Sequence, residues 1–253
     1  MLEDYADRVW RGEDGDSIVD AGWSGKGVVT VTDGVGWWPG FGNVVTFETE
    51  GELVLWDTSS PISASQLHQD VRAWTKAPLT AAFYSHGHID HVFGLGPFEE
   101  NGPRPTVYAH ELVVPRFQRY VLTNGYNAVI NQRQFQNPGL RWPRHYRHPD
   151  VTFRDGLTVR VGGLTFDLVH AKGETDDHAF AYVPEHRILL TGDLFIWVTP
   201  NCGNPQKAQR YPREWAHALR RMAALDAEIM LPNHSTPIFN HNHIQQTLLK
   251  TTK

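Results

Sequence analysis

The stretch Ser85-His86-Gly87-His88-Ile89-Asp90-His91 decides how this chain is interpreted. It places three imidazoles and one carboxylate within six residues, and Gly87 allows a tight turn between them. It directly follows Leu79–Tyr84, a short apolar run typical of a buried strand. Imidazole and carboxylate suit zinc, and also iron or manganese, so the first two histidines can bind one cation and the Asp-His pair a second. The alternative is a histidine cluster on a surface loop. Binding metal is favoured, because four such residues at a strand end have little other use.

Three further apolar runs end in side chains that can bind metals. The run Leu164–Gly173 leads to Glu174, Arg187–Gly192 leads to Asp193, and Glu228–Asn233 leads to His234. Loops at strand ends converge on one edge of a sheet, where sites are usually built. We therefore expect Asp193 to be a bridging carboxylate and His234 a ligand. The alternatives are a carboxylate that caps a turn and a histidine that is merely buried or capping.

These motifs resemble one known family. The order and spacing of HGHIDH, of TGD ending at Asp193 and of LPNH ending at His234 are similar to those of the metallo-β-lactamase superfamily, over roughly Val28 to Phe239. The resemblance implies an α/β fold, an αββα sandwich, in a single domain over residues 1–253, with a helical insert at about 110–137. It also implies a dinuclear site whose ligands are His86, His88, Asp90, His91, Glu174, Asp193 and His234.

The third motif departs from that pattern. The superfamily usually has Gly-His-Thr about nineteen residues before the bridging Asp, and here that position holds Gly173-Glu174-Thr175. Glu174 is therefore expected to replace the usual histidine as third ligand of the first metal, with His170 as a rival. His178 is left open as a ligand, a proton donor or a supporting partner, and catalytic roles are assigned to Asp90 and His178.

A glutamate at this place is a feature of the alkyl sulfatases of the superfamily. The segment Tyr108–Gln136 also resembles their helical insert, whereas they commonly carry Glu where this chain has Asp193. The pattern of apolar residues predicts helices and strands throughout the rest of the chain. Helices are expected at Ser63–Thr75, Glu111–Gln136 (broken near Asn124–Gly125), Pro212–Ala224 and His243–Lys250. Strands are expected at Val28–Asp33, Asn43–Glu48, Leu53–Asp57, Val151–Phe153, Thr158–Val161, Leu164–His170, Ala179–Val183, Ile188–Thr191 and Ile229–Leu231.

Two segments are candidates for substrate binding. Gly34–Gly42 holds four glycines and three aromatic residues, so it is expected to be a loop and a flexible flap over the metals rather than a regular strand. A hydrophobic plug over the core is the alternative. The segment after Asp193 could bind an anionic oxygen group, or could be a solvated loop. The candidate substrate-binding residues are Trp37, Trp38, Phe41, Asn201, Lys207, Arg210 and Tyr211.

Composition limits the partners and the compartment. The 253 residues include 23 basic and 28 acidic side chains, a formal charge of −5, and one cysteine, Cys202. This balance argues against nucleic acid and anionic membranes, and a lone cysteine excludes an intrachain disulfide framework. No apolar leader is present in Met1–Gly15. We expect a cytoplasmic protein with a small-molecule substrate, no nucleic-acid partner and no membrane partner; a homo-oligomer is left open.

The predicted chemistry is metal-dependent hydrolysis. Two divalent cations, zinc foremost with manganese or iron as alternatives, bring charge +4, three carboxylates bring −3, and a bridging hydroxide balances the total. The first hypothesis is a hydrolase that uses this hydroxide on an ester or sulfate ester; for alkyl sulfatases the resemblance implies C–O cleavage. A β-lactam or lactone hydrolase of the same fold is the second, and an inactive metal-binding scaffold is the third.

Overall fold

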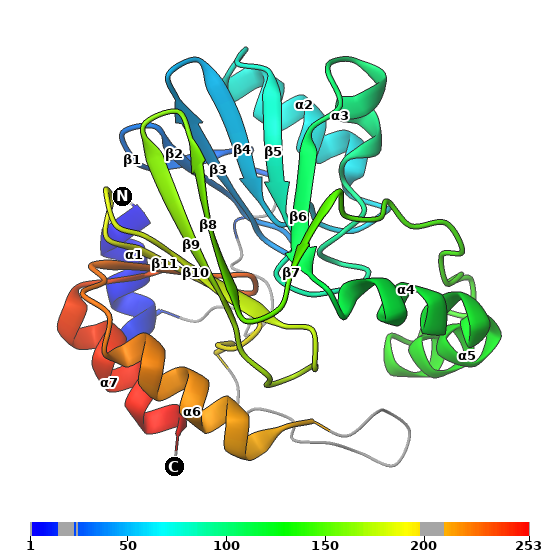
Figure 1. Ribbon diagram of the computed structural model, residues 1–253. Helices are drawn as coiled ribbons and strands as arrows, with labels where there is room; N and C mark the ends of the chain where they lie inside the picture. The colour runs from blue at the N-terminus through cyan, green and yellow to red at the C-terminus, as the bar shows by residue number, and fades with distance from the viewer. Residues whose placement is uncertain (1, 15–22, 24, 198–209, 253) are drawn as a thin grey trace.

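Two β-sheets pack face to face, and helices cover both outer faces (Figure 1). The computed structural model describes residues 2–14, 23, 25–197 and 210–252. The layers follow the order helix, sheet, sheet, helix, so the predicted αββα arrangement is confirmed. No helix in these ranges is long and apolar enough to cross a membrane.

The first sheet contains seven strands arranged in chain order. They are β1 (Val29–Thr32), β2 (Val35–Trp38), β3 (Val44–Thr49), β4 (Glu52–Trp56), β5 (Leu79–Phe83), β6 (Thr106–His110) and β7 (Val151–Phe153). Strands β1 to β4 pair antiparallel, whereas β4 to β7 pair parallel. The parallel pairs send their carboxyl ends to one edge of the sheet, where loops can assemble a site.

The second sheet has six strands in the order β13-β12-β11-β10-β9-β8. Their bounds are β8 (Gly156–Val161), β9 (Leu164–His170), β10 (Ala179–Val183), β11 (Ile188–Gly192), β12 (Ile229–Pro232) and β13 (Ile238–Phe239). β11 and β12 pair parallel, and the other neighbours pair antiparallel. The carboxyl ends of β11 and β12 therefore deliver their loops to the same edge.

The main hydrophobic core lies between the sheets. The buried ring of Phe166 from β9 lies 5.2 Å edge-on from Phe47 of β3 and 5.0 Å from Phe83 of β5, measured between ring centroids. Alternate residues of β9 are buried, as a strand with one face in a core requires. Aromatic rings from both sheets thus interlock across the interface and fix their mutual position.

Helices cover the outer faces. The helices on the first sheet are α2 (Ala64–Trp74), α3 (Gly96–Glu100) and α4 (Val113–Leu122), and α5 (Asn124–Gln134) follows α4. The helices on the second sheet are α6 (Pro212–Ala223) and α7 (His241–Thr251). Helix α1 (Leu2–Trp10) contacts β13. In α2, Leu67 and Val71 are one turn apart and both are buried. Ser63 holds the N-cap position, but its side chain makes no capping hydrogen bond.

Gly34–Gly42 corrects one expectation, because Val35–Trp38 within it form a regular strand rather than a loop. Its first half contains β2, which is buried along its whole length and pairs with both β1 and β3. Gly36 makes this possible, because a Cβ there would lie 2.4 Å from the side chain of Val28 and 2.5 Å from that of Thr46. The glycine that suggested a loop therefore allows close packing within a strand.

The segment expected to be helical, Glu111–Gln136, is confirmed as helix but corrected at its start. Residues up to His110 form β6, which pairs parallel with β5 and β7, and the helices begin at Val113. The break falls at Thr123, between α4 and α5. The sequence pattern did not identify α1, α3, β2, β6 or β13 as separate elements.

Candidate metal centre

Loops from both sheets bring the predicted ligands to one edge. The loop after β5 carries His86, His88, Asp90 and His91, and the segments after β9, β11 and β12 carry Glu174, Asp193 and His234. All seven lie in two groups of potential ligands, and within each group the donor atoms lie within 4.8 Å of one another. The structure thus brings together every residue predicted as a metal ligand.

The first group is His86, His88, Glu174 and Asp193. His86 Nε2 lies 2.8 Å from His88 Nδ1 and 3.7 Å from Glu174 Oε2. Glu174 Oε2 is also 3.5 Å from His88 Nδ1. Glu174 therefore stands where a third ligand of the first cation is expected.

The second group is Asp90, His91 and His234. Asp90 Oδ2 lies 3.5 Å from His91 Nε2 and 3.4 Å from His234 Nε2. One oxygen joins the two groups, because Asp193 Oδ2 is 3.4 Å from His91 Nε2, 3.2 Å from His234 Nε2 and 3.8 Å from His86 Nε2. This shared oxygen has the position that a bridging carboxylate requires.

Charge differs between the two groups. Burial lowers the pKa of His86 well below its usual value and that of His88 to about 3, so these imidazoles are neutral, the form that binds metals. Burial opposes a charge on His91 and His234 as well. There the nearby carboxylates outweigh it, raising the pKa of His91 well above its usual value and that of His234 to about 10. A cation that replaces these protons meets the same carboxylates.

Burial raises the pKa of Glu174 to about 7, with the charge of Asp193 adding to the shift and Arg210 opposing it. Two carboxylates this close resist simultaneous ionisation unless a positive charge joins them. Several buried polar atoms here have no hydrogen-bond partner, among them His91 Nε2, Glu174 Oε2 and Asp193 Oδ1. A nitrogen and oxygen donor set with unpartnered buried atoms fits two divalent cations.

Asp57 is a functional residue that the sequence interpretation missed. It follows β4, is fully buried, and accepts hydrogen bonds from the Ser85 amide at 2.6 Å and from the Asn233 side chain at 2.6 Å. Its Oδ2 also lies 2.9 Å from His91 Nδ1, so it orients the ligand imidazole. The signal was available, because Asp57 ends an apolar strand as the predicted ligands do.

A second buried carboxylate, Asp177, holds the turn between His86 and His88. Its Oδ2 accepts from the Gly87 amide at 2.9 Å, and its Oδ1 lies 2.8 Å from Nε of Arg116 in α4. A Cβ at Gly87 would lie 2.7 Å from Arg116 and 3.0 Å from Asp177, so only glycine fits there. α4 is thereby tied to the metal loop.

The two contested histidines lie outside both groups of donor atoms. His178 is buried, its ring stacks on His86 at 4.5 Å, and its Nε2 accepts from the Asp193 amide at 3.0 Å. This contact orients Asp193. His170 Nε2 lies 2.8 Å from the Asp176 carbonyl, and its ring stacks on His110 at 3.8 Å, so the structure does not bring it to the ligands.

The residues predicted to bind substrate separate into three sets. Trp37 and Trp38 are buried in the fold, and Trp38 Nε1 donates to Asp70 at 2.8 Å, which corrects their expected place on a flap. Phe41 is 42% exposed and lies edge-on to His234 at 5.2 Å. Asn201 and Lys207 lie outside the described residues.

A large cavity opens over the ligands. Its volume is about 1470 Å³, and it is lined by Phe41, Arg210, Tyr211, residues of α4 and α5, and the ligands His88, Asp90, Glu174, Asp193 and His234. Arg210 makes an ion pair with Glu174 Oε1, so its charge is already engaged at the metal site rather than free for an anionic substrate. The mouth is therefore formed by the insert and the floor by the strand-end loops.

The comparisons with known proteins agree with this geometry. A linear primary-alkylsulfatase of a Pseudomonas species (strain ATCC 19151) is 25% identical over 223 residues, 79% of this chain and 42% of that protein. A hydroxyacylglutathione hydrolase of Pseudomonas aeruginosa (strain LESB58) is 28% identical over 163 residues, 62% of this chain and 49% of its own length. The chain thus spans under half the length of these relatives.

A solved structure shows the same fold. The stereoselective inverting sec-alkylsulfatase of a Pseudomonas species superposes with a TM-score of 0.74 at 18% identity, covering 89% of this chain and 41% of that one. Sheets, helices and paired ligand groups together define an α/β fold with a metal site at the strand ends. The model of the metallo-beta-lactamase superfamily matches residues 37–234, and the chain belongs to that superfamily. The alkylsulfatase relatives support the resemblance to that branch.

Proposed function

We propose that this chain is a dinuclear-metal hydrolase that cleaves an ester or sulfate ester of a small molecule. The observation that carries the proposal is the shared carboxylate oxygen of Asp193, which lies within 4 Å of nitrogens from both ligand groups on the floor of a cavity. A scaffold that only bound metal would not need an open cavity over both groups. The proposal treats the chain as one domain with α4 and α5 as its insert.

Each ligand has a distinct place in this proposal. His86, His88 and Glu174 would hold one cation, Asp90, His91 and His234 the other, and Asp193 both, with zinc as the first choice of metal. Two such cations would supply Lewis acidity and would lower the pKa of water to near neutrality. Asp57 and Asp177 keep the imidazoles and the turn in position for this.

We keep catalytic roles for His178 and Asp90. The role proposed for His178 is to position Asp193. Burial lowers the pKa of His178 to about 4, so its neutral ring accepts a hydrogen bond from the Asp193 backbone amide and holds the backbone that carries this carboxylate. Asp90 lines the cavity and would face the substrate. Because Arg210 pairs with Glu174, it is not the free cation beside the metals that a ring hydrolase would need.

Similarity to an alkylsulfatase, together with Glu174 at the third motif, supports the choice of sulfate ester or ester.

The test is a turnover panel of aryl sulfate, aryl ester, phosphodiester, lactone, β-lactam and thioester substrates with added zinc or manganese. We expect close to two metal equivalents per chain by elemental analysis, and turnover of an ester or sulfate ester that Asp193→Asn abolishes. A metal-free protein with full activity would contradict the mechanism, and two bound metals without turnover of any substrate would favour the scaffold.

A further inference from the structure

Charge is unevenly distributed in this chain. Residues 112–149 contain six arginines and neither Lys, Asp nor Glu, so this segment carries +6. The remaining residues hold 17 basic and 28 acidic side chains, a balance of 17 − 28 = −11. The net charge of −5 thus conceals a strongly cationic segment. The argument against an anionic partner rested on this net charge and does not apply to the segment.

Four of these arginines have no carboxylate partner in the described part of the chain. They are Arg119, Arg133, Arg141 and Arg144, and all four are exposed. The other two are engaged: Arg116 pairs with Asp177, and Arg147 pairs with Glu99. Arg119, Arg133 and Arg141 line the large cavity, and all four charges are exposed to an external anion.

Exposed apolar side chains gather on the same segment. Nine large hydrophobic residues are exposed among the described residues, and five of them belong to α4, α5 and the residue after α5: Val121, Leu122, Tyr126, Val129 and Phe135. Two more, Phe41 and Ile62, line the cavity whose wall these helices form. Scattered apolar residues are normal on a protein surface, but five of the nine on one segment mark an interaction site.

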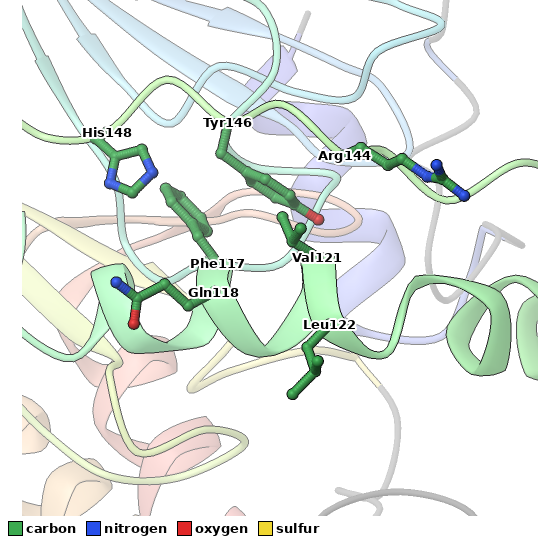
Figure 2. Close-up of a pocket in the computed structure, with 7 residues that line it drawn as sticks. All are labelled: Phe117, Gln118, Val121, Leu122, Arg144, Tyr146 and His148. Atoms are coloured by element: carbon green, nitrogen blue, oxygen red, sulfur yellow. The ribbon is translucent and has the colours of Figure 1, made fainter.

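The placement of the helices suits a partner larger than a single small molecule. Figure 1 shows α4 and α5 projecting at one side of the molecule, away from α6 and α7. Figure 2 shows Val121 and Leu122 at the end of α4, where Leu122 projects on the opposite side of the helix from Tyr146. These residues line a second, smaller hollow of about 470 Å³. Leu122 is 86% exposed, so nothing in the described chain covers it.

We propose that α4, α5 and residues 137–144, here called the insert face, dock on the surface of an anionic phospholipid bilayer. Exposed arginines attract acidic headgroups, and Leu122, Val129 and Phe135 can enter the boundary between headgroups and acyl chains. The two requirements for interfacial binding, cationic charge and apolar side chains, thus meet in the insert face, part of which lines the large cavity. The rest of the molecule carries a charge of −11 and would be repelled by an anionic surface, so the molecule would approach with the insert face first.

Other occupants fit less well. In a two-fold dimer the same face would meet itself, which sets four unpaired arginines against four more. A nucleic acid would use the charge, but it offers no apolar layer for Leu122 or Val129. A bilayer complements both features, and the insert face borders the mouth of the cavity, so an amphiphilic ester could pass from bilayer to metal site. That last link rests on the proposed function; the docking does not.

Vesicle co-sedimentation of the full chain tests the proposal. The vesicles contain phosphatidylcholine alone or with 30% phosphatidylglycerol, and glycerol phosphate serves as a free headgroup competitor. We expect binding to the anionic vesicles alone, reversed by about 0.5 M salt because screening shortens the reach of charge. Arg133→Gln with Arg141→Gln should weaken binding about 25-fold, at roughly fivefold per arginine. Leu122→Ser with Val129→Ser should also weaken it.

Matched variants separate docking from general surface effects. Arg160→Gln with Arg213→Gln removes two exposed arginines elsewhere, and Val151→Ser with Leu249→Ser removes two exposed apolar residues elsewhere. Both pairs should bind as the wild type does. Equal binding to neutral vesicles, equal loss in the control pairs, or a dimer that covers Leu122 in light scattering and labelling would overturn the proposal. Vesicle binding needs no turnover, so an enzyme inactive on every ester that still binds would refute only the proposed function.

Discussion

Glu174 is the residue that sets this site apart from a site built on a third histidine. It adds a negative charge beside Asp193, and Arg210 pairs with its outer oxygen while Oε2 faces His86 and His88. One oxygen of Glu174 thus faces the candidate ligands, and the other links the candidate metal centre to Arg210, two residues before α6. Its neighbour His170, the rival from the sequence, instead stacks on His110.

We expect Glu174→Ala to lose the first cation, because two neutral imidazoles and a shared carboxylate remain. His170→Ala should retain both cations, since its ring does not reach the donor atoms. Elemental analysis of the two purified variants makes the comparison. The reverse pattern would assign the ligand to His170.

Asp57→Asn should weaken binding of the second cation by about 10- to 100-fold, because an amide orients and polarises the His91 ring less well than a carboxylate. Competition with a chromogenic chelator measures the affinity of each site. The exposed Asp33→Asn is the control and should bind as the wild type does. An unchanged second site in Asp57→Asn would remove Asp57 from the positioning role.

Asp177→Asn tests the tie between α4 and the metal loop in the same way. The variant keeps an oxygen for the Gly87 amide but loses the charge that pairs with Arg116. We expect weaker binding of the first cation and little change at the second. Asp177→Glu, which restores the charge, should recover part of the loss, whereas loss at both sites alike would indicate a general folding defect.

At the scale of elements, two strand ends meet through a histidine pair. His110 ends β6 of one sheet and His170 ends β9 of the other. His110 Nε2 donates to the Arg154 carbonyl at 2.8 Å, and the Leu112 amide donates to Nδ1, so the neutral ring is fully bonded. Burial lowers the pKa of His110, with the charge of His170 adding to the shift, while the Arg154 carbonyl and the carboxylates of Glu111 and Asp177 oppose it.

This pair predicts a pH dependence of stability. Because the folded pKa of His110 lies below its unfolded value near 6.5, the unfolded chain binds more protons between these two values. The contribution is fully present above the unfolded pKa and is lost as pH falls through the folded pKa. His110→Gln should therefore flatten the rise in unfolding free energy between pH 5 and 7, measured by urea titration against wild type. The exposed His145→Gln should keep the wild-type slope.

The elements themselves were largely predictable where periodicity was clear. β7, β9 and β10 have the bounds that apolar alternation predicts, and α2 and α6 differ by a residue at their ends. β2 was missed because Gly36 normally argues for a loop, and only its neighbours Val28 and Thr46 reveal why glycine is needed. The side chains of Trp37 and Trp38 were placed on a flap because nothing local distinguishes a buried aromatic residue from an exposed one.

At the scale of the whole molecule, the sheets are held together by the rings of their interface. Phe166→Ala removes the ring that contacts Phe47 and Phe83 and should lower the unfolding free energy by about 3–5 kcal/mol. Guanidinium titration measures the change, and the exposed Val151→Ala should leave the midpoint almost unchanged. A small effect of Phe166→Ala would mean that the interface repacks.

Metal removal should loosen the same interface. Ligands from β5 belong to one sheet and those from β11 and β12 to the other, so two cations would join the sheets. Cations present at about a hundred times their dissociation constant would stabilise the fold by roughly 2.7 kcal/mol. Chelation should lower the melting temperature measured by calorimetry, and zinc should restore it. An unchanged melting temperature after complete metal removal would contradict a metal link between the sheets.

The sequence by itself determined the seven ligand candidates and most of the strands and helices, because strand-end motifs and apolar periodicity are local properties of the chain. The layer order followed from the resemblance of those motifs to a known family. Only the tertiary structure decided that Asp57 and Asp177 orient those ligands, that Arg210 is engaged by Glu174, and that the tryptophans of β2 are buried. These outcomes depend on contacts between residues distant in the chain, such as Asp57 with Asn233. The physical reason is that a side chain's charge state and exposure are set by its neighbours in space.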